Sequence, residues 1–183
     1  MNSDDELLKE YLVALDALVG GSGRYLKIPN ADAPFWLIAY DDVPEKGSVT
    51  AFTFGISFVR HPSWQSGVPE VVISVNSTDD DWLLSLGAIA CSLRGKCPFS
   101  YGNVLRFGKP LGRETEMSSY FLFWPTILEK DQQQLIISDR VVSFKQAYPI
   151  FESEADAIGK TGAEKLFMMD GVDYSDVSRD KVA

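Results

Sequence analysis

Histidine and cysteine are scarce in this chain of 183 residues, which has one histidine, His61, and two cysteines, Cys91 and Cys97. The cysteines lie close together in one local stretch, so they do not make a disulfide framework. Two cysteines and one histidine also fall short of the four ligands of an ordinary structural zinc site. We therefore expect no metal, no cofactor and a reducing, cytoplasmic environment.

Long apolar runs are absent as well. No stretch approaches the ~20 apolar residues that a membrane-spanning helix needs. The N-terminus reads MNSDDELLKE and is acidic, whereas a secretory signal begins with basic residues followed by an apolar segment. We expect a cytoplasmic protein that has no membrane partner.

Basic residues are outnumbered by acidic ones. The chain has 17 Lys and Arg against 26 Asp and Glu, which gives a net charge of −9 at pH 7. A broad nucleic-acid surface needs a basic face that displaces counterions from phosphates, so we expect no nucleic-acid partner. The negative field suits a basic protein partner, although solubility alone also accounts for it.

The sequence also lacks a recognisable catalytic constellation. A Ser-His-Asp or Cys-His mechanism would use His61 as its base, but no G-x-S-x-G elbow is present. Pro62 biases His61 toward extended backbone, and Cys91 lies on the apolar half of a predicted helix, where a thiol behaves as a small hydrophobe. We assign no catalytic residue and interpret His61 as part of the scaffold.

Two polar motifs have competing interpretations. The aspartates at 79–81 suggest either a metal or acid–base cluster or the start of a helix, and we favour the helix start because carboxylates stabilise its positive dipole end. The glycines of GGSG (20–23) follow a predicted helix instead of opening one. They are typical of a helix C-cap, not of a phosphate-binding loop, which needs Gly-Lys-Ser/Thr at a helix start.

Hydrophobic periodicity predicts the elements that are present. A capping-box pattern, Ser3 with Glu6, opens the first helix, and Gly55 marks a bulge or a close backbone approach within a strand. The predicted helices are 3–19, 77–96 and 152–171, the second capped by Ser77 or Thr78, and the predicted strands are 34–40, 49–59, 70–75, 103–107, 119–124, 134–139 and 141–151.

This order favours an α+β fold with a mixed, mostly antiparallel central sheet and flanking helices, because strands and helices do not alternate regularly. The length suits one domain. We place that domain at residues 1–171, with the N-terminal helix at 3–19 and the core at 34–170, and expect residues 172–183 to form a polar, flexible tail.

Four segments together resemble the suppressor-of-fused (SUFU-like) domain family. They read FTFGISFVRHPSW…PEVVISV, WLLSLGAIACSLR…CPFSYGNVL, SYFLFWP and FKQAYPIFESEADAIGKTGAEKL. The resemblance implies a non-enzymatic α+β domain. In animals the family regulator binds a transcription factor and holds it inactive, whereas bacterial relatives are typically single domains, many of which look like immunity proteins that neutralise a toxin. We expect a single domain, without the second domain of the animal regulator, which argues against the transcription-factor role.

The resemblance therefore implies a protein partner, and the acidic charge suits a basic toxin such as a nuclease. We predict partner contacts in the loop 60–69 through Trp64, since an exposed Trp is a favoured interface anchor. Burial of that ring against the sheet is the competing interpretation. The acidic turn that holds Asp41, Asp42 and Glu45 is the second predicted contact.

Two other functions stay open. The first is a hydrolase that uses scattered carboxylates, which sequence spacing cannot group. The second is a dimeric regulatory module in which an edge strand such as 103–107 pairs with another chain. The sequence does not set the oligomeric state.

Overall fold

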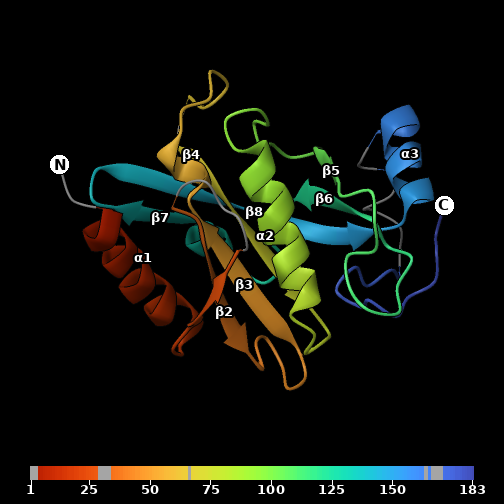
Figure 1. Cartoon of the computed structure of the whole chain (residues 1–183), viewed down its shortest axis with the longest axis horizontal. Coiled ribbons are helices and arrows are strands. Elements are labelled where there is room, and N and C mark those ends of the chain that lie inside the picture. The colour runs from red at the N-terminus through yellow and green to blue at the C-terminus, as the bar shows by residue number, and fades with distance from the viewer. Residues whose placement is uncertain (1–3, 29–33, 66, 163–164, 166–170) are drawn as a thin grey trace.

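The computed structural model describes residues 4–28, 34–65, 67–162, 165 and 171–183. Within these residues the chain forms one eight-stranded sheet with three α-helices (Figure 1). The elements are α1 (Asp4–Val19), β1 (Arg24–Lys27), β2 (Trp36–Asp41), β3 (Val49–Phe54), β4 (Val68–Val75), α2 (Asp81–Leu93), β5 (Val104–Arg106), β6 (Ser119–Phe123), β7 (Gln134–Ile137), β8 (Arg140–Ile150) and α3 (Glu152–Thr161).

The sheet is mixed, in the strand order β1-β2-β3-β4-β8-β6-β5, with β7 also paired to β8. Neighbouring strands are antiparallel except for the central pair β4 and β8, which is parallel. The expected α+β class with a mostly antiparallel sheet is confirmed. The parallel pair arises because α2, β5, β6 and β7 intervene between β4 and β8 in the chain, which allows a crossover.

Alternating side chains give the sheet two buried faces. On β4, Ile73 packs into the cluster under α2, while its neighbour Val72 packs into the cluster under α1, as expected when successive side chains point to opposite faces. On β8, Phe144 belongs to the α1 cluster and Tyr148 to the α3 cluster. Helices α1 and α3 thus cover the same face, and α2 covers the other.

The predicted strand 49–59 ends earlier than expected, at Phe54, and a 3₁₀ turn follows at Ile56–Phe58. The reason lies at Gly55, whose φ of 145° is a conformation that side chains disfavour. A Cβ there would lie 2.8 Å from the carbonyl oxygen of Pro34. The close backbone approach expected at this glycine is therefore what breaks the strand.

The N-terminal region departs from the sequence-based prediction in two places. The predicted capping residue Ser3 lies outside the described residues. Strand β1, Arg24–Lys27, was not predicted, because its four residues lack the β-branched pattern of the other strands. It forms by pairing with β2, so tertiary context decides it.

Helix α2 is shorter than the predicted 77–96 and begins at Asp81. Ser77, an expected cap, instead accepts a hydrogen bond from the backbone N–H of Asp79. Asp80 occupies the cap position without a side-chain capping bond, because its carboxylate binds Arg24.

Helix α3 ends at Thr161, and Gly162 follows with a φ of 85°, a positive value that glycine adopts readily. The expected continuation to residue 171 falls mostly on residues outside those described.

The segment after residue 171 was expected to be loose, and the structure instead packs it against α3. Tyr174 is buried, and Arg179 forms an ion pair at 2.7 Å with Glu154 in which both side chains are buried. The Glu154 carboxylate also accepts bonds from the backbone N–H groups of Phe151 and Val182. This ion pair explains how a segment with charged residues packs against the domain, since a buried charge requires a partner.

Candidate functional site

His61 and Trp64 lie in the connection between β3 and β4. The Trp64 side chain is half-buried, and its indole N–H donates to the carbonyl oxygen of Pro98 at 2.8 Å. His61 Nδ1 accepts from the backbone N–H of Ser63, and its ring lies 5.7 Å from that of Trp64. The contacts of His61 are thus with its own loop, which supports its interpretation as scaffold.

Trp64 forms one wall of a surface hollow of about 480 Å³. We call this hollow the aromatic groove. Its lining includes Trp64, Phe99, Tyr101, Trp124, Ser143 and Lys145.

The groove exists because two strands share one edge of β8. Strand β7 pairs with residues 140–143 and β6 with residues 146–150, both on the edge opposite β4. The residues between them, 124–133, leave the sheet, so β8 has no strand along this edge between residues 143 and 146. Ser143 and Lys145 on β8 point to the α2 face here and form the floor of the groove.

An aromatic pair and a lysine dominate the groove. The Trp124 ring stacks on Tyr101 with centroids 4.7 Å apart, yet Trp124 is 51% exposed. Lys145 Nζ lies 4.2 Å from the Tyr101 ring centroid and donates to Ser143 Oγ at 2.7 Å. Burial lowers the pKa of Lys145 and raises that of Tyr101. Such a site can hold an apolar side chain beside a hydrogen-bond acceptor.

The charge of the groove differs from that of the whole chain. Lys130 and Lys145 line it, and no Asp or Glu is among the described lining residues. In a chain of net charge −9, this is a locally positive, aromatic surface.

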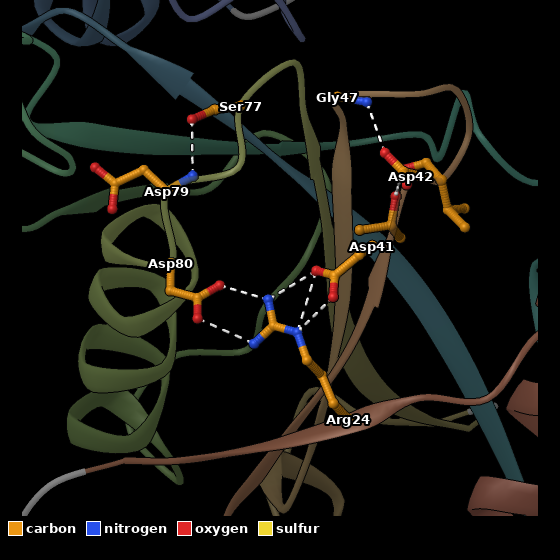
Figure 2. A network of polar contacts seen from close by, with 9 residues as sticks. Arg24, Asp41, Asp42, Gly47, Ser77, Asp79 and Asp80 are labelled. Atoms are coloured by element: carbon orange, nitrogen blue, oxygen red, sulfur yellow. Dashed lines mark hydrogen bonds and ion pairs between the residues drawn. The ribbon is translucent and has the colours of Figure 1, made fainter.

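The predicted acidic turn lies elsewhere, at the loop between β2 and β3. Figure 2 shows the Arg24 guanidinium between the carboxylates of Asp41, at 2.8 Å, and Asp80, at 2.6 Å. We call these three residues the Arg24 network. Hydrogen bonds from Arg24 lower the pKa of Asp41.

The other two predicted acidic residues serve the turn itself. The carboxylate of Asp42 accepts from the backbone N–H of Gly47 at 2.8 Å (Figure 2). The backbone oxygen of Glu45 accepts from Ser48 N–H, and the Glu45 side chain is exposed.

The structure separates Trp64 from this turn. Trp64 precedes the start of β4, whereas Asp41 pairs with Val49, which in turn pairs with Val75 at the end of β4. Eight residues of strand span roughly 26 Å. Trp64 and the acidic turn therefore lie at opposite ends of the sheet, and each remains a separate prediction of a partner contact.

Sequence reasoning missed Tyr101, Trp124 and Lys145. Trp124 was predicted to be the last residue of the strand 119–124, yet β6 ends at Phe123. Pro125 directly after it cannot continue a paired strand, and this was the available signal for the departure of Trp124 from the sheet. No local sequence pattern indicates that Lys145 lies over the ring of Tyr101.

The buried carboxylate of Glu70 bears on the hydrolase alternative. It accepts bonds from Thr53 Oγ1 at 2.6 Å and from the backbone N–H groups of Gly55 and Ser57. Desolvation raises its pKa despite these bonds. Glu70 thus holds the backbone of residues 55–57 in place. Because it has no exposed surface, it does not meet a substrate.

Two features of the described residues bear on other functions. They contain no group of three or more His, Cys, Asp or Glu side chains placed to hold a metal ion. Among them, no helix combines the length and the apolar character that a bilayer crossing would require.

Comparison with known proteins gives one family and one fold. The family model described as "Suppressor of fused protein (SUFU)" matches residues 31–180, which include most of the packed C-terminal segment. A SUFU homolog from Neisseria gonorrhoeae is similar in structure with a TM-score of 0.70 at 16% identity, over 97% of this chain and 95% of that one. No curated protein matched this sequence.

Two further solved structures share the fold. The chain matched in the Sufu–Fu complex has a TM-score of 0.72 at 12% identity, over 94% of this chain and 90% of that one. Drosophila Suppressor of Fused has a TM-score of 0.66 at 14% identity, and the match covers 94% of this chain and 50% of the fly protein.

Proposed function

The chain belongs to the suppressor of fused family, and from this premise we propose that it is a protein-binding domain without catalytic activity that holds its partner in the aromatic groove. The observation that carries the proposal is the half-exposed Trp124, stacked on Tyr101 beside Lys145. Trp and Tyr side chains in a hollow are common anchors of protein interfaces.

The geometry of the groove suits this role. Tyr101 holds the Trp124 ring in place, so an incoming side chain meets a preorganised aromatic surface and little conformational entropy is lost on binding. Lys145 offers a cation to a carbonyl or carboxylate of the partner. One structural relative was solved in the Sufu–Fu complex, so a protein partner is known for that relative, and this supports the same class of function here.

The partner that we propose is a cognate toxin, which makes this chain an immunity protein. Neutralising a toxin is stoichiometric binding, so it needs a rigid scaffold and an anchor instead of a tuned catalytic group. The net charge of −9 would attract a basic toxin such as a nuclease over long range. The acidic surface would then increase the association rate, and the aromatic groove would supply most of the affinity.

Co-expression with the product of the neighbouring gene tests the function. We expect protection from growth inhibition and a 1:1 complex by size-exclusion chromatography with light scattering. Trp124→Ala should weaken the complex about 30-fold while circular dichroism shows an unchanged fold. No protection and no complex with the unaltered chain would contradict the immunity role.

The same measurement of mass tests the dimeric alternative. Strand β5, the edge strand proposed to pair with another chain, is three residues long, and its Arg106 forms ion pairs with Glu152 and Asp156 of α3. A mass of one chain for the free protein would argue against the dimer.

A further inference from the structure

A second hollow, of about 400 Å³, lies on the sheet face opposite the aromatic groove. Its floor includes Ser74 of β4 with Gln146 and Tyr148 of β8, whose side chains point away from the groove because Gln146 follows Lys145 on the strand. Its walls are residues 126–127 and the segment 172–175. We call it the Gln146 cavity.

Gln146 lines this cavity and carries a donor that the described residues leave unused. The side chain is 1% exposed, and its Oε1 accepts the backbone N–H of Thr126 at 2.8 Å. Within the described part of the chain, Gln146 Nε2 is buried and has no hydrogen-bond partner. The amide cannot be turned over, because Thr126 N–H requires an oxygen at the position of Oε1.

A buried amide donor without an acceptor is destabilising, so an acceptor is expected from outside the chain. A cavity of this size is in the range of small-molecule sites, ~300–1,000 Å³. The lining combines a few polar groups with the apolar side chains of Pro44, Ile127 and Val172, which is the usual composition of such sites.

The charges of the walls select a neutral ligand. Asp173 lines the cavity, and its Oδ1 accepts from Ser175 N and Oγ. Tyr148 donates to the carbonyl oxygen of Trp124 at 2.6 Å, and burial raises its pKa to about 12, so it stays a neutral phenol at physiological pH. A carboxylate ligand would meet Asp173 in a chain of net charge −9, whereas an amide can accept from Gln146 and offer its N–H to oxygen atoms of the wall.

We propose that the Gln146 cavity binds a neutral carboxamide, whose carbonyl oxygen accepts the free Nε2–H of Gln146 and whose apolar part packs on Ile127 and Val172. The amide belongs either to a small molecule or to a peptide segment. This site is separate from the aromatic groove and does not depend on the partner-binding function.

Titration of the ¹⁵N-labelled full chain tests the site by NMR. Propionamide should shift the Gln146 side-chain NH₂ and the Thr126 N–H resonances saturably, and propionate, of similar size but charged, should bind at least about tenfold more weakly because of Asp173. N-acetylglycine N-methylamide is the peptide arm. Tighter binding of that probe assigns the site to a peptide segment, and tighter binding of propionamide assigns it to a small molecule.

Two variants separate the site from chance binding. Gln146→Met removes the donor at similar length, and Val172→Phe fills the cavity while leaving the Gln146 bonds to Thr126 in place, so it is informative even if the first variant fails to fold. Both should abolish the saturable shift, with circular dichroism unchanged for Val172→Phe. The proposal is overturned if propionamide causes no saturable shift, if Val172→Phe binds it equally, or if a resident water stays bound to Gln146 Nε2 and is not displaced.

Discussion

The Arg24 network and the aromatic groove lie at opposite ends of the same sheet and use their polar groups in opposite ways. In the Arg24 network the guanidinium is placed between two carboxylates of the same chain, and it ties β1 to β2 and to the start of α2 (Figure 2). In the aromatic groove the ring of Trp124 stays half-exposed, and Lys145 faces an aromatic ring instead of a carboxylate.

This difference separates charges that stabilise from groups that remain available. An Arg already shared by two carboxylates has little left to offer a partner, because binding would first have to break contacts within the chain. A stacked, half-exposed Trp buries more apolar surface when a partner binds, and no ion pair of its side chain has to be broken first. The acidic turn therefore suits steering, and the groove suits contact.

Removal of the groove's exposed ring should have the largest effect. Trp124→Ala is expected to weaken partner binding about 30-fold, or about 2 kcal/mol, with little change in the free energy of unfolding. Tyr25→Ala at the other end of the sheet is the matched control, since Tyr25 is 54% exposed, close to the 51% of Trp124. Isothermal titration calorimetry measures both, and an equal loss for the two variants would remove the distinction between the regions.

The Arg24 network should respond in stability and not in binding. Arg24→Met leaves Asp41 and Asp80 near one another without their cation, so the free energy of unfolding should fall by about 1 kcal/mol, since solvent screens these partly exposed groups. Urea denaturation measures this. Arg113→Met is the control, because the Arg113 side chain is 79% exposed beside Asp79 and Asp81, and its effect should be smaller. A weaker partner affinity for Arg24→Met would place the binding surface at this end.

The acidic turn should affect how fast the partner arrives. The double variant Asp42→Asn and Glu45→Gln is expected to slow association with a basic partner roughly twofold to threefold at low salt and to leave dissociation unchanged. High salt should remove the difference, because it screens exposed charges. Stopped-flow or surface plasmon resonance kinetics show this. A change confined to the dissociation rate would mean that the turn makes direct contact.

The smallest effect is a pH dependence at Asp41. Its pKa is lowered in the folded state by Arg24, so its contribution to stability is present above the unfolded pKa, ~3.9, and is lost as the pH falls through the folded pKa. Wild type should therefore lose stability relative to Arg24→Met below about pH 4. Thermal unfolding at a series of pH values tests this, and parallel curves for the two proteins would show that Arg24 does not lower the pKa of Asp41.

Sequence periodicity found the parts of the fold that depend on local patterning. The faces of α1 and α2 and the apolar strands β3, β4 and β6 were visible, because a buried face repeats with the period of its element. Strand β1 was not visible, since RYLK carries no such pattern and is extended only because it pairs with β2. The end of the strand at Gly55 was predicted only in part. The sequence indicated a bulge or a close backbone approach at the glycine, but not that the approaching group is the backbone of Pro34.

The candidate sites depended on contacts that no local pattern encodes. The partners in the groove are distant in the chain, since Trp124 stacks on Tyr101 and Lys145 lies over the same Tyr101 ring only once β6 pairs with β8. Likewise, Arg179 in the C-terminal segment has the sequence context of a solvated charge until α3 places Glu154 beside it.

The sequence by itself determined the class of fold, the family resemblance and the acidic character, because composition and periodicity are summed along the chain and need no partner. Only the tertiary structure decided where a partner can be held. Placing β7 and β6 one after the other along one edge of β8 opens the groove between them. The pairing of strands far apart in sequence is set by the packing of the whole core.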